Sequence, residues 1–194
     1  MLTYECFYVN LVLNMLNRLD DLNSAYSFED DSFEVTVDRT CAMWLENVFQ
    51  LYRDTPVEQL QRNIKVTFTG EAGLDGGALS REFFFMSFNG LISQPIMSHE
   101  LFEGSRGHLL PAIDHVLTDA RGYWFVGVLT AQAVNKGCKG LPGLCNAVRH
   151  FLFSGAKISN IKTSLELVTA KDVADLELRM VVTKVRDSCC IIQV

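Results

Sequence analysis

Glu71 and Asp75, two carboxylates in a glycine-rich stretch, are the residues of this chain with the clearest potential for chemistry. Paired carboxylates can perform acid–base catalysis, but no histidine or other partner lies near them in sequence. Glycines before a helix can also cradle a phosphate, yet this stretch has no lysine and its carboxylates would repel one. The ligand pattern of an EF-hand calcium loop is absent too. The sequence therefore favours a rigid structural corner.

A strand and a helix must position these carboxylates. Apolar and polar side chains alternate in 64–69, which predicts a half-buried strand. Apolar residues on most sides of 78–92 predict a core helix. Asp75 stands where it can cap the first amides of that helix. We expect Gly76 or Gly77 to adopt a positive φ, because the chain must turn sharply between strand and helix.

The six cysteines do not form the pattern of a zinc site or a disulfide framework. They stand at positions 6, 41, 138, 145, 189 and 190, without a C-x-x-C pair, and the histidines do not complete a ligand set. We expect Cys41 and Cys145 to lie on apolar helix faces as small hydrophobic residues. This usage favours a reducing, intracellular setting, in the cytoplasm, the nucleus or both, and predicts neither metal nor cofactor.

The histidines and serines give no sign of a catalytic group. The residues in question are His99, His108, His115, His150, Ser80, Ser87 and Ser98. The first three histidines stand in or beside polar segments, where solvated histidine is common, and the fourth follows an arginine whose charge disfavours its protonation. No activating base for the serines is visible in the sequence. The sequence therefore predicts no catalytic residue.

The composition is that of a globular protein with one acidic segment. The chain has 194 residues, of which 48% are hydrophobic and 21% charged, with a net charge of −6. Most of that charge lies in 18–34, where six acidic residues stand against one arginine. The absence of a basic stripe predicts no binding to nucleic acid, and an acidic segment disfavours anionic membranes. The apolar stretch 6–19 is too short to span a bilayer.

The order of these patterns predicts an α+β protein that is predominantly helical with a few short strands. We expect a leader helix and acidic linker in 1–32, a compact region in 33–187 and a short tail in 188–194. Segments 104–111 and 136–143 have the composition of loops. Two further helices are predicted in 144–153 and in about 170–185, where apolar residues recur at helical spacing.

The glycine corner resembles the signature near the start of HECT-type ubiquitin ligases. The residues that carry this resemblance follow a V-x-F strand and are Gly70, Glu71, Gly73, Asp75, Gly76, Gly77, Arg81, Glu82, Phe83 and Phe84. Phe33–Arg39, followed by a helix carrying Cys41, is similar to the opening strand and helix of that family. Leu101-Phe102 and the segment 123–137 agree with it in order, and 172–178 is most similar to its G2/M phase-specific branch.

This resemblance implies part of a HECT N-terminal lobe. Such ligases accept ubiquitin from a conjugating enzyme as a thioester on a cysteine of a C-terminal lobe. We expect that lobe to lie beyond Val194, since no Thr-Cys-Phe occurs here and the one Thr-Cys pair, Thr40-Cys41, falls in the expected opening helix. The implied partners are a conjugating enzyme or ubiquitin, and the chain is expected to be inactive alone.

A non-catalytic function remains open beside the ligase interpretation. A chain with this fold could bind other proteins or compete with a complete ligase as a decoy. If the chain is a fragment, helices that pack against missing neighbours should expose apolar surface. We expect such exposure for the helices at 123–134 and 170–185, because one is apolar nearly all round and the other has a valine-rich face.

Overall fold

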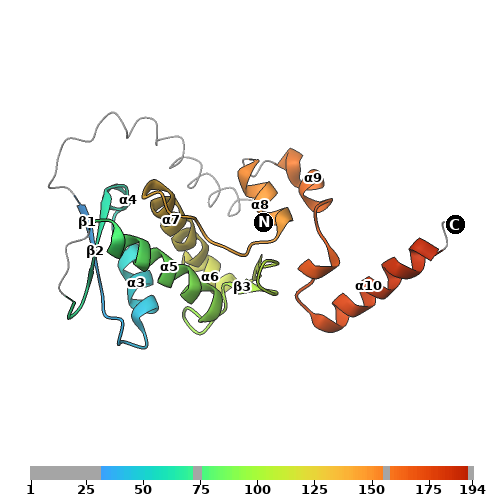
Figure 1. Ribbon diagram of the computed structural model, residues 1–194, viewed down its shortest axis with the longest axis horizontal. Coiled ribbons are helices and arrows are strands. Elements are labelled where there is room, and N and C mark those ends of the chain that lie inside the picture. Colours follow the sequence, from blue (N-terminus) through green and yellow to red (C-terminus); the bar gives the residue numbers. More distant parts are fainter. Residues whose placement is uncertain (1–31, 72–75, 155–157, 192–194) are drawn as a thin grey trace. The chain divides into compact units, whose positions relative to one another are not determined.

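The computed structural model describes residues 32–71, 76–154 and 158–191, which divide between two compact units (Figure 1). The first unit contains the described residues of 1–101 together with 114–141. The second unit contains 102–113 and the described residues from 142 onward. The predicted leader in 1–32 lies almost wholly outside the described residues.

The first unit is built on a pair of parallel strands. β1 (Ser32–Val37) and β2 (Asn63–Phe68) pair in register from Ser32 with Asn63 to Val37 with Phe68. The predicted alternation is confirmed, because the three apolar side chains of β2 are buried and its polar ones are exposed. Parallel strands need a crossover, and α3 (Trp44–Asp54) with α4 (Val57–Leu60) supplies it.

Two long helices form the core of this unit. α5 (Ala78–Ser93) confirms the predicted core helix, and α7 (Gly122–Asn135) packs against both α3 and α5. The short α6 (His115–Asp119) precedes α7. The aromatic rings of Phe33, Tyr52 and Phe125 meet edge to face between these elements, with centroids 5.1–5.3 Å apart.

The expectation that 123–134 is left uncovered is wrong. Ten residues of α7 are buried, and among its large apolar side chains only Val134 is appreciably exposed. A helix that is apolar nearly all round can be buried on all sides within one unit. The helices α3, α5 and α6, which precede α7 in the chain, pack against it.

The second unit consists of short elements followed by one long helix. β3 (Phe102–Glu103) and β4 (Leu110–Pro111) form an antiparallel pair, so the ends of the predicted loop 104–111 are held together. α8 (Asn146–Phe153), η1 (Ile158–Asn160) and α9 (Ile161–Leu165) follow, then η2 (Ala170–Asp172) and α10 (Leu176–Ile191).

The single helix predicted for 170–185 is wrong. Asp172 ends the 3₁₀ turn η2, where it forms a capping box with Thr169, and α10 begins only at Leu176. The side chain of Asp175 accepts a hydrogen bond from the Leu178 amide and so caps the new helix. The expected exposure is found here, because Leu176, Leu178, Met180 and Val181 of α10 are each more than half exposed.

These elements confirm the coarse fold class, since the described residues form an α+β protein that is predominantly helical. The strands are short and pair only in twos. Within the described ranges no helix combines the length and the apolar character that crossing a membrane requires.

Candidate functional site

Arg39 joins both sides of the glycine corner. Its Nη1 donates a hydrogen bond to Glu82 Oε1 at 2.6 Å, and its Nε lies 3.0 Å from Glu71 Oε1. The second contact is ionic, because the Nε–H is not aligned for a hydrogen bond. The guanidinium also lies over the Phe68 ring, 3.6 Å from its centre, a cation–π contact. One side chain thus ties the end of β2, the turn after it and the start of α5 together.

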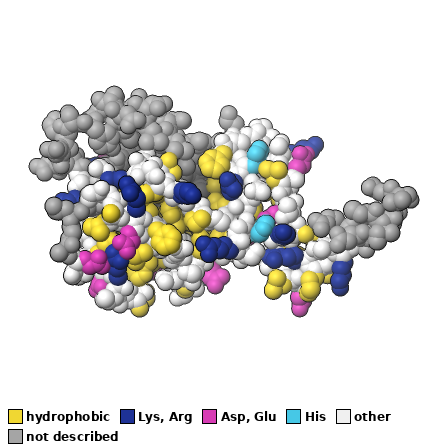
Figure 2. Space-filling view, viewed as in Figure 1, with side chains coloured by type: hydrophobic (Ala, Val, Ile, Leu, Met, Phe, Trp, Pro, Cys, Tyr) yellow, Lys and Arg dark blue, Asp and Glu magenta, His cyan; other side chains and the backbone are white. Residues whose placement is uncertain are grey.

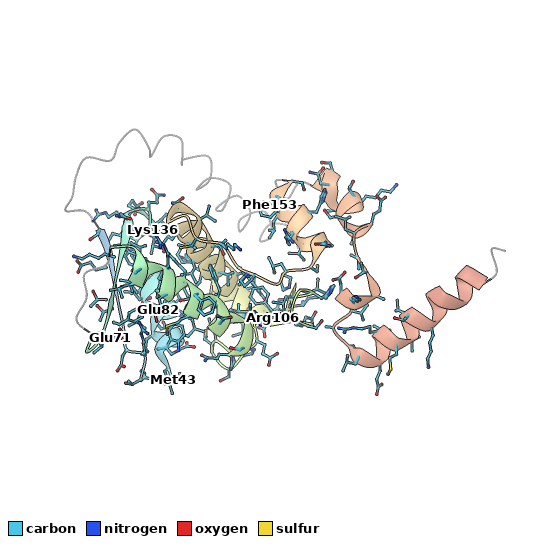
Figure 3. The ribbon with its side chains drawn as sticks, in the orientation of Figure 1. Met43, Glu71, Glu82, Arg106, Lys136 and Phe153 are labelled. Atoms are coloured by element: carbon cyan, nitrogen blue, oxygen red, sulfur yellow. The ribbon has the colours of Figure 1, made fainter. Side chains whose placement is uncertain are left out.

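The two glutamates of the corner can be followed in Figure 3. Figure 3 labels Glu71 and Glu82, the first after β2 and the second on α5. Figure 2 shows acidic and basic side chains next to each other in that region of the visible face. We name this cluster of Arg39, Glu71, Glu82 and Phe68 the arginine corner.

The backbone of the corner depends on glycine at one predicted position. Gly77 is the N-cap of α5 and has a φ of +98°, which confirms the prediction for Gly76 or Gly77. Gly76 does not have a positive φ, but Gly70, in the turn after β2, has one of +80°. Residues other than glycine rarely adopt these backbone angles, so glycine is required at the entry to α5.

The signature residues differ in their surroundings. Gly70, Glu71, Gly76, Arg81 and Glu82 are exposed, whereas Phe83 and Phe84 are buried in the core. Gly73 and Asp75 lie outside the described residues, so the predicted capping by Asp75 stays a prediction. The motif therefore has two parts, a pair of buried aromatic anchors and an exposed polar corner.

The two glutamates of the corner do not form an acid–base pair. A catalytic carboxylate must be placed to exchange a proton with a substrate. Glu71 and Glu82 instead share the positive charge of Arg39, with all three side chains partly exposed to water. The arrangement holds two elements together. The pair of Glu71 and Asp75 that the sequence suggests stays untested, because Asp75 lies outside the described residues.

Two of the histidines expected to be solvated are partly exposed and also contact carboxylates. His99 Nδ1 lies 2.6 Å from Asp114 Oδ2, and His108 Nδ1 lies 2.7 Å from Asp172 Oδ1. A carboxylate oxygen only accepts, so each imidazole donates through Nδ1. His115, by contrast, is exposed as expected.

Both aspartates also hold backbone groups in place. Asp114 accepts a hydrogen bond from the Leu117 amide at the start of α6, and this bond, together with that from His99, holds the pKa of Asp114 below its usual value. Burial raises the pKa of Asp172, but the hydrogen bonds from His108 and Thr169 outweigh it and keep that pKa low. These pairs are structural clamps.

His150 contacts a buried serine. Its Nδ1 lies 2.9 Å from the hydroxyl of Ser164, and that hydroxyl also lies within hydrogen-bond distance, 2.9 Å, of the carbonyl of Asn160. When the serine proton is given to the carbonyl, the imidazole is the donor in the first bond. Ser164 is buried, and this contact links α8 to α9.

The cysteines are not placed as the sequence suggests. Cys41 lies in the turn before α3, half-buried, so neither it nor Thr40 belongs to the opening helix. Cys145 is buried, but it stands at the N-cap of α8, where its sulfur accepts a weak hydrogen bond from the Val148 amide at 3.5 Å. Within the described residues, no group of three or more histidine, cysteine or acidic side chains could hold a metal ion.

Sequence reasoning misses the central residue of the corner. Arg39 is 43 positions away from Glu82, and nothing in either segment alone predicts their contact. The N-cap role of Asp114 has a detectable signal, because an aspartate three residues before the Leu117 amide is a common helix start. No family model matches the chain, and a comparison with curated proteins gives no match either. A family assignment therefore depends on the motif residues and their arrangement in the arginine corner.

Proposed function

We propose that this chain is part of the N-terminal lobe of a HECT-type ubiquitin ligase. The observation that carries the proposal is the arginine corner. Phe33–Arg39 and the glycine signature resemble two separate segments of that family, and Arg39 links them through Glu71 and Glu82. Two independent sequence resemblances thus belong to one structural feature, which is expected if they derive from one fold.

The burial pattern is compatible with the same proposal. Phe83 and Phe84 of the signature are core residues, and the helix that resembles the next family element is buried as α7. In this proposal the aromatic pair of the segment serves the core, and its charged residues serve the exposed corner. These two roles together account for the many residues of this short segment that resemble the family signature. In this proposal the N-terminal lobe is a scaffold, and ubiquitin is transferred through a cysteine outside this chain.

The proposed partners are ubiquitin-pathway proteins, in an intracellular setting. A conjugating enzyme would bring ubiquitin as a thioester, and the complete ligase would pass it to a lysine of a substrate. In this proposal the chain contributes positioning, and the chemistry belongs to the C-terminal lobe.

A thioester assay tests this proposal. The transcript is read past Val194 for an in-frame Thr-Cys context, and the longer protein is incubated with activating enzyme, conjugating enzymes and ubiquitin. We expect a ubiquitin adduct that is reducible and is lost when that cysteine becomes serine. The 194-residue chain should form no adduct. An adduct on this chain that disappears in Cys41→Ser or Cys189→Ser would contradict the proposal.

A non-catalytic interaction module is the second candidate, and the exposed side chains of α10 favour it. Leu178 and Val181 lie three residues apart on one side of that helix, both more than half exposed. Such a face is common in helices that pack against another protein. If the transcript contains no downstream Thr-Cys context and a longer protein forms no adduct, this candidate replaces the ligase.

A further inference from the structure

The outer edge of β1 has unpaired backbone groups. The carbonyl of Val37 accepts a hydrogen bond from the Thr69 amide, so Val37 directs its backbone groups toward β2. Directions alternate along a strand, and Glu34 and Thr36 therefore direct their N–H and C=O groups to the opposite edge. None of the residues that the structure describes forms a hydrogen bond with these groups. An exposed strand edge of this kind can template another strand.

A hollow of about 440 Å³ lies along this edge. One wall is β1 and the residue after it, and the other wall is a stripe of α3. The lining includes Glu34, Thr36, Asp38, Trp44, Asn47 and Leu51. Glu34, Thr36 and Val37 of β1 line the hollow, whereas β2 itself contributes none and only Thr69, directly after it, takes part. The hollow therefore lies mainly along β1.

The charged side chains that line the hollow are all acidic. Glu34 and Asp38 line it, and no lysine or arginine does. Glu34 has one exposed ion pair, to Lys65 at 3.3 Å. Asp38 accepts hydrogen bonds from Thr40, but the described residues include no basic partner for it. A ligand that fits this hollow should carry positive charge near Asp38 and an aliphatic group near Leu51 of the α3 wall.

We propose that the β1 edge binds an extended segment of a partner protein as an additional strand, with a lysine or arginine of that segment next to Asp38. Backbone pairing with Glu34 and Thr36 would supply affinity, and alternate side chains would supply selectivity. β1 has six residues, which corresponds to about 20 Å of extended chain. Nucleic acid is disfavoured by the two carboxylates. This inference does not depend on the proposed ligase function.

Two peptides of matched length test the proposal with the full chain. One is an eight-residue peptide that alternates valine and lysine, and the other alternates valine and glutamate. We expect the basic peptide to shift the amide NMR signals of Glu34 and Thr36, protect them from hydrogen exchange and change Trp44 fluorescence. The acidic peptide should produce none of these effects at the same concentration, because its glutamates and the carboxylates of Glu34 and Asp38 are all negative and repel each other.

The variant Thr36→Pro distinguishes binding by strand addition from other modes of peptide binding. Proline has no N–H, and in a sheet it is tolerated where the N–H points away from the neighbouring strand. Thr36→Pro should therefore weaken binding of the basic peptide by about tenfold or more, whereas Thr36→Val, which keeps the N–H, should bind as the natural chain does. Asp38→Asn should weaken binding about threefold to tenfold, with the loss reduced by added salt.

Three outcomes would overturn the proposal. The first is equal binding of the basic and acidic peptides, and the second is equal binding by Thr36→Val and a folded Thr36→Pro. The third is protection of the Glu34 and Thr36 amides before any peptide is added, which would mean that residues of the chain itself occupy the edge. If Thr36→Pro does not fold, Asp38→Asn and the acidic peptide decide the question.

Discussion

The hydroxyl of Tyr52 donates a hydrogen bond of 2.6 Å to Oε1 of Gln132, although the two residues are 80 positions apart. The amide nitrogen of Gln132 donates in turn to the carbonyl of Leu60 at 2.7 Å. Both side chains are buried, and burial raises the pKa of Tyr52, so its hydroxyl remains a neutral donor. This chain of bonds ties α3, α4 and α7 together inside the first unit.

Breaking this pair should destabilise the protein. Tyr52→Phe leaves Oε1 of Gln132 buried without its donor, which costs about 1–3 kcal/mol in the free energy of unfolding. Urea unfolding at pH 7 measures the change. In the double-mutant cycle with Gln132→Leu, the two losses should not add, because both variants remove the same bond. Strictly additive losses would show that the bond contributes nothing.

Alanine at Gly77 and at Gly76 should have different effects. Gly77 has a φ of +98°, so Gly77→Ala forces an alanine into the left-handed region and should lower stability by about 1 kcal/mol or more. Gly76 has no positive φ, and an added Cβ there meets no atom within 4 Å. Gly76→Ala should therefore leave the melting temperature nearly unchanged. Equal melting temperatures for both variants would contradict the requirement for glycine at position 77.

The arginine corner should contribute more stability than an ordinary surface ion pair. Arg39→Met removes two ionic contacts and the contact with Phe68, and we expect a loss of about 1–2 kcal/mol. Lys65→Met removes only the exposed pair with Glu34 and should change stability by less than about 0.5 kcal/mol. Chemical unfolding of both variants gives the comparison. A loss for Arg39→Met no larger than that for the lysine variant would argue against the corner.

The clamp between His108 and Asp172 should make stability sensitive to acid. The pKa of Asp172 is lowered in the folded state, so this carboxylate contributes stability that is present above its ordinary value of 3.8 and is lost as pH falls through the lowered pKa. At pH 7, Asp172→Asn should cost about 1–3 kcal/mol, because the buried clamp loses its charged acceptor.

Unfolding at pH 7, 5 and 3 tests this dependence. The difference between the natural chain and Asp172→Asn should be similar at pH 7 and 5 and smaller at pH 3. Asp119→Asn, at an exposed position of α6, is the control and should have little effect at pH 7. A difference that stays constant down to pH 3 would show that the charge of Asp172 is not involved.

Local patterns in the sequence determined the elements around the glycine corner. The alternation in 64–69 predicts β2, and the apolar content of 78–92 predicts α5. The sharp turn between them predicts a positive φ at Gly76 or Gly77, and Gly77 has it. These features depend on residues within a few positions of each other, where periodicity and backbone sterics are sufficient. The burial of two adjacent phenylalanines in α5 follows from the same argument.

Only the tertiary structure decided which distant residues meet. Arg39 and Glu82, His108 and Asp172, and Tyr52 and Gln132 are 43, 64 and 80 positions apart, and their contacts exist because folding brings separate elements together. Periodicity reports that a helix has apolar sides but not what covers them. The sequence therefore predicted exposed apolar surface for both α7 and α10. The structure shows that α7 is buried and that α10 is exposed.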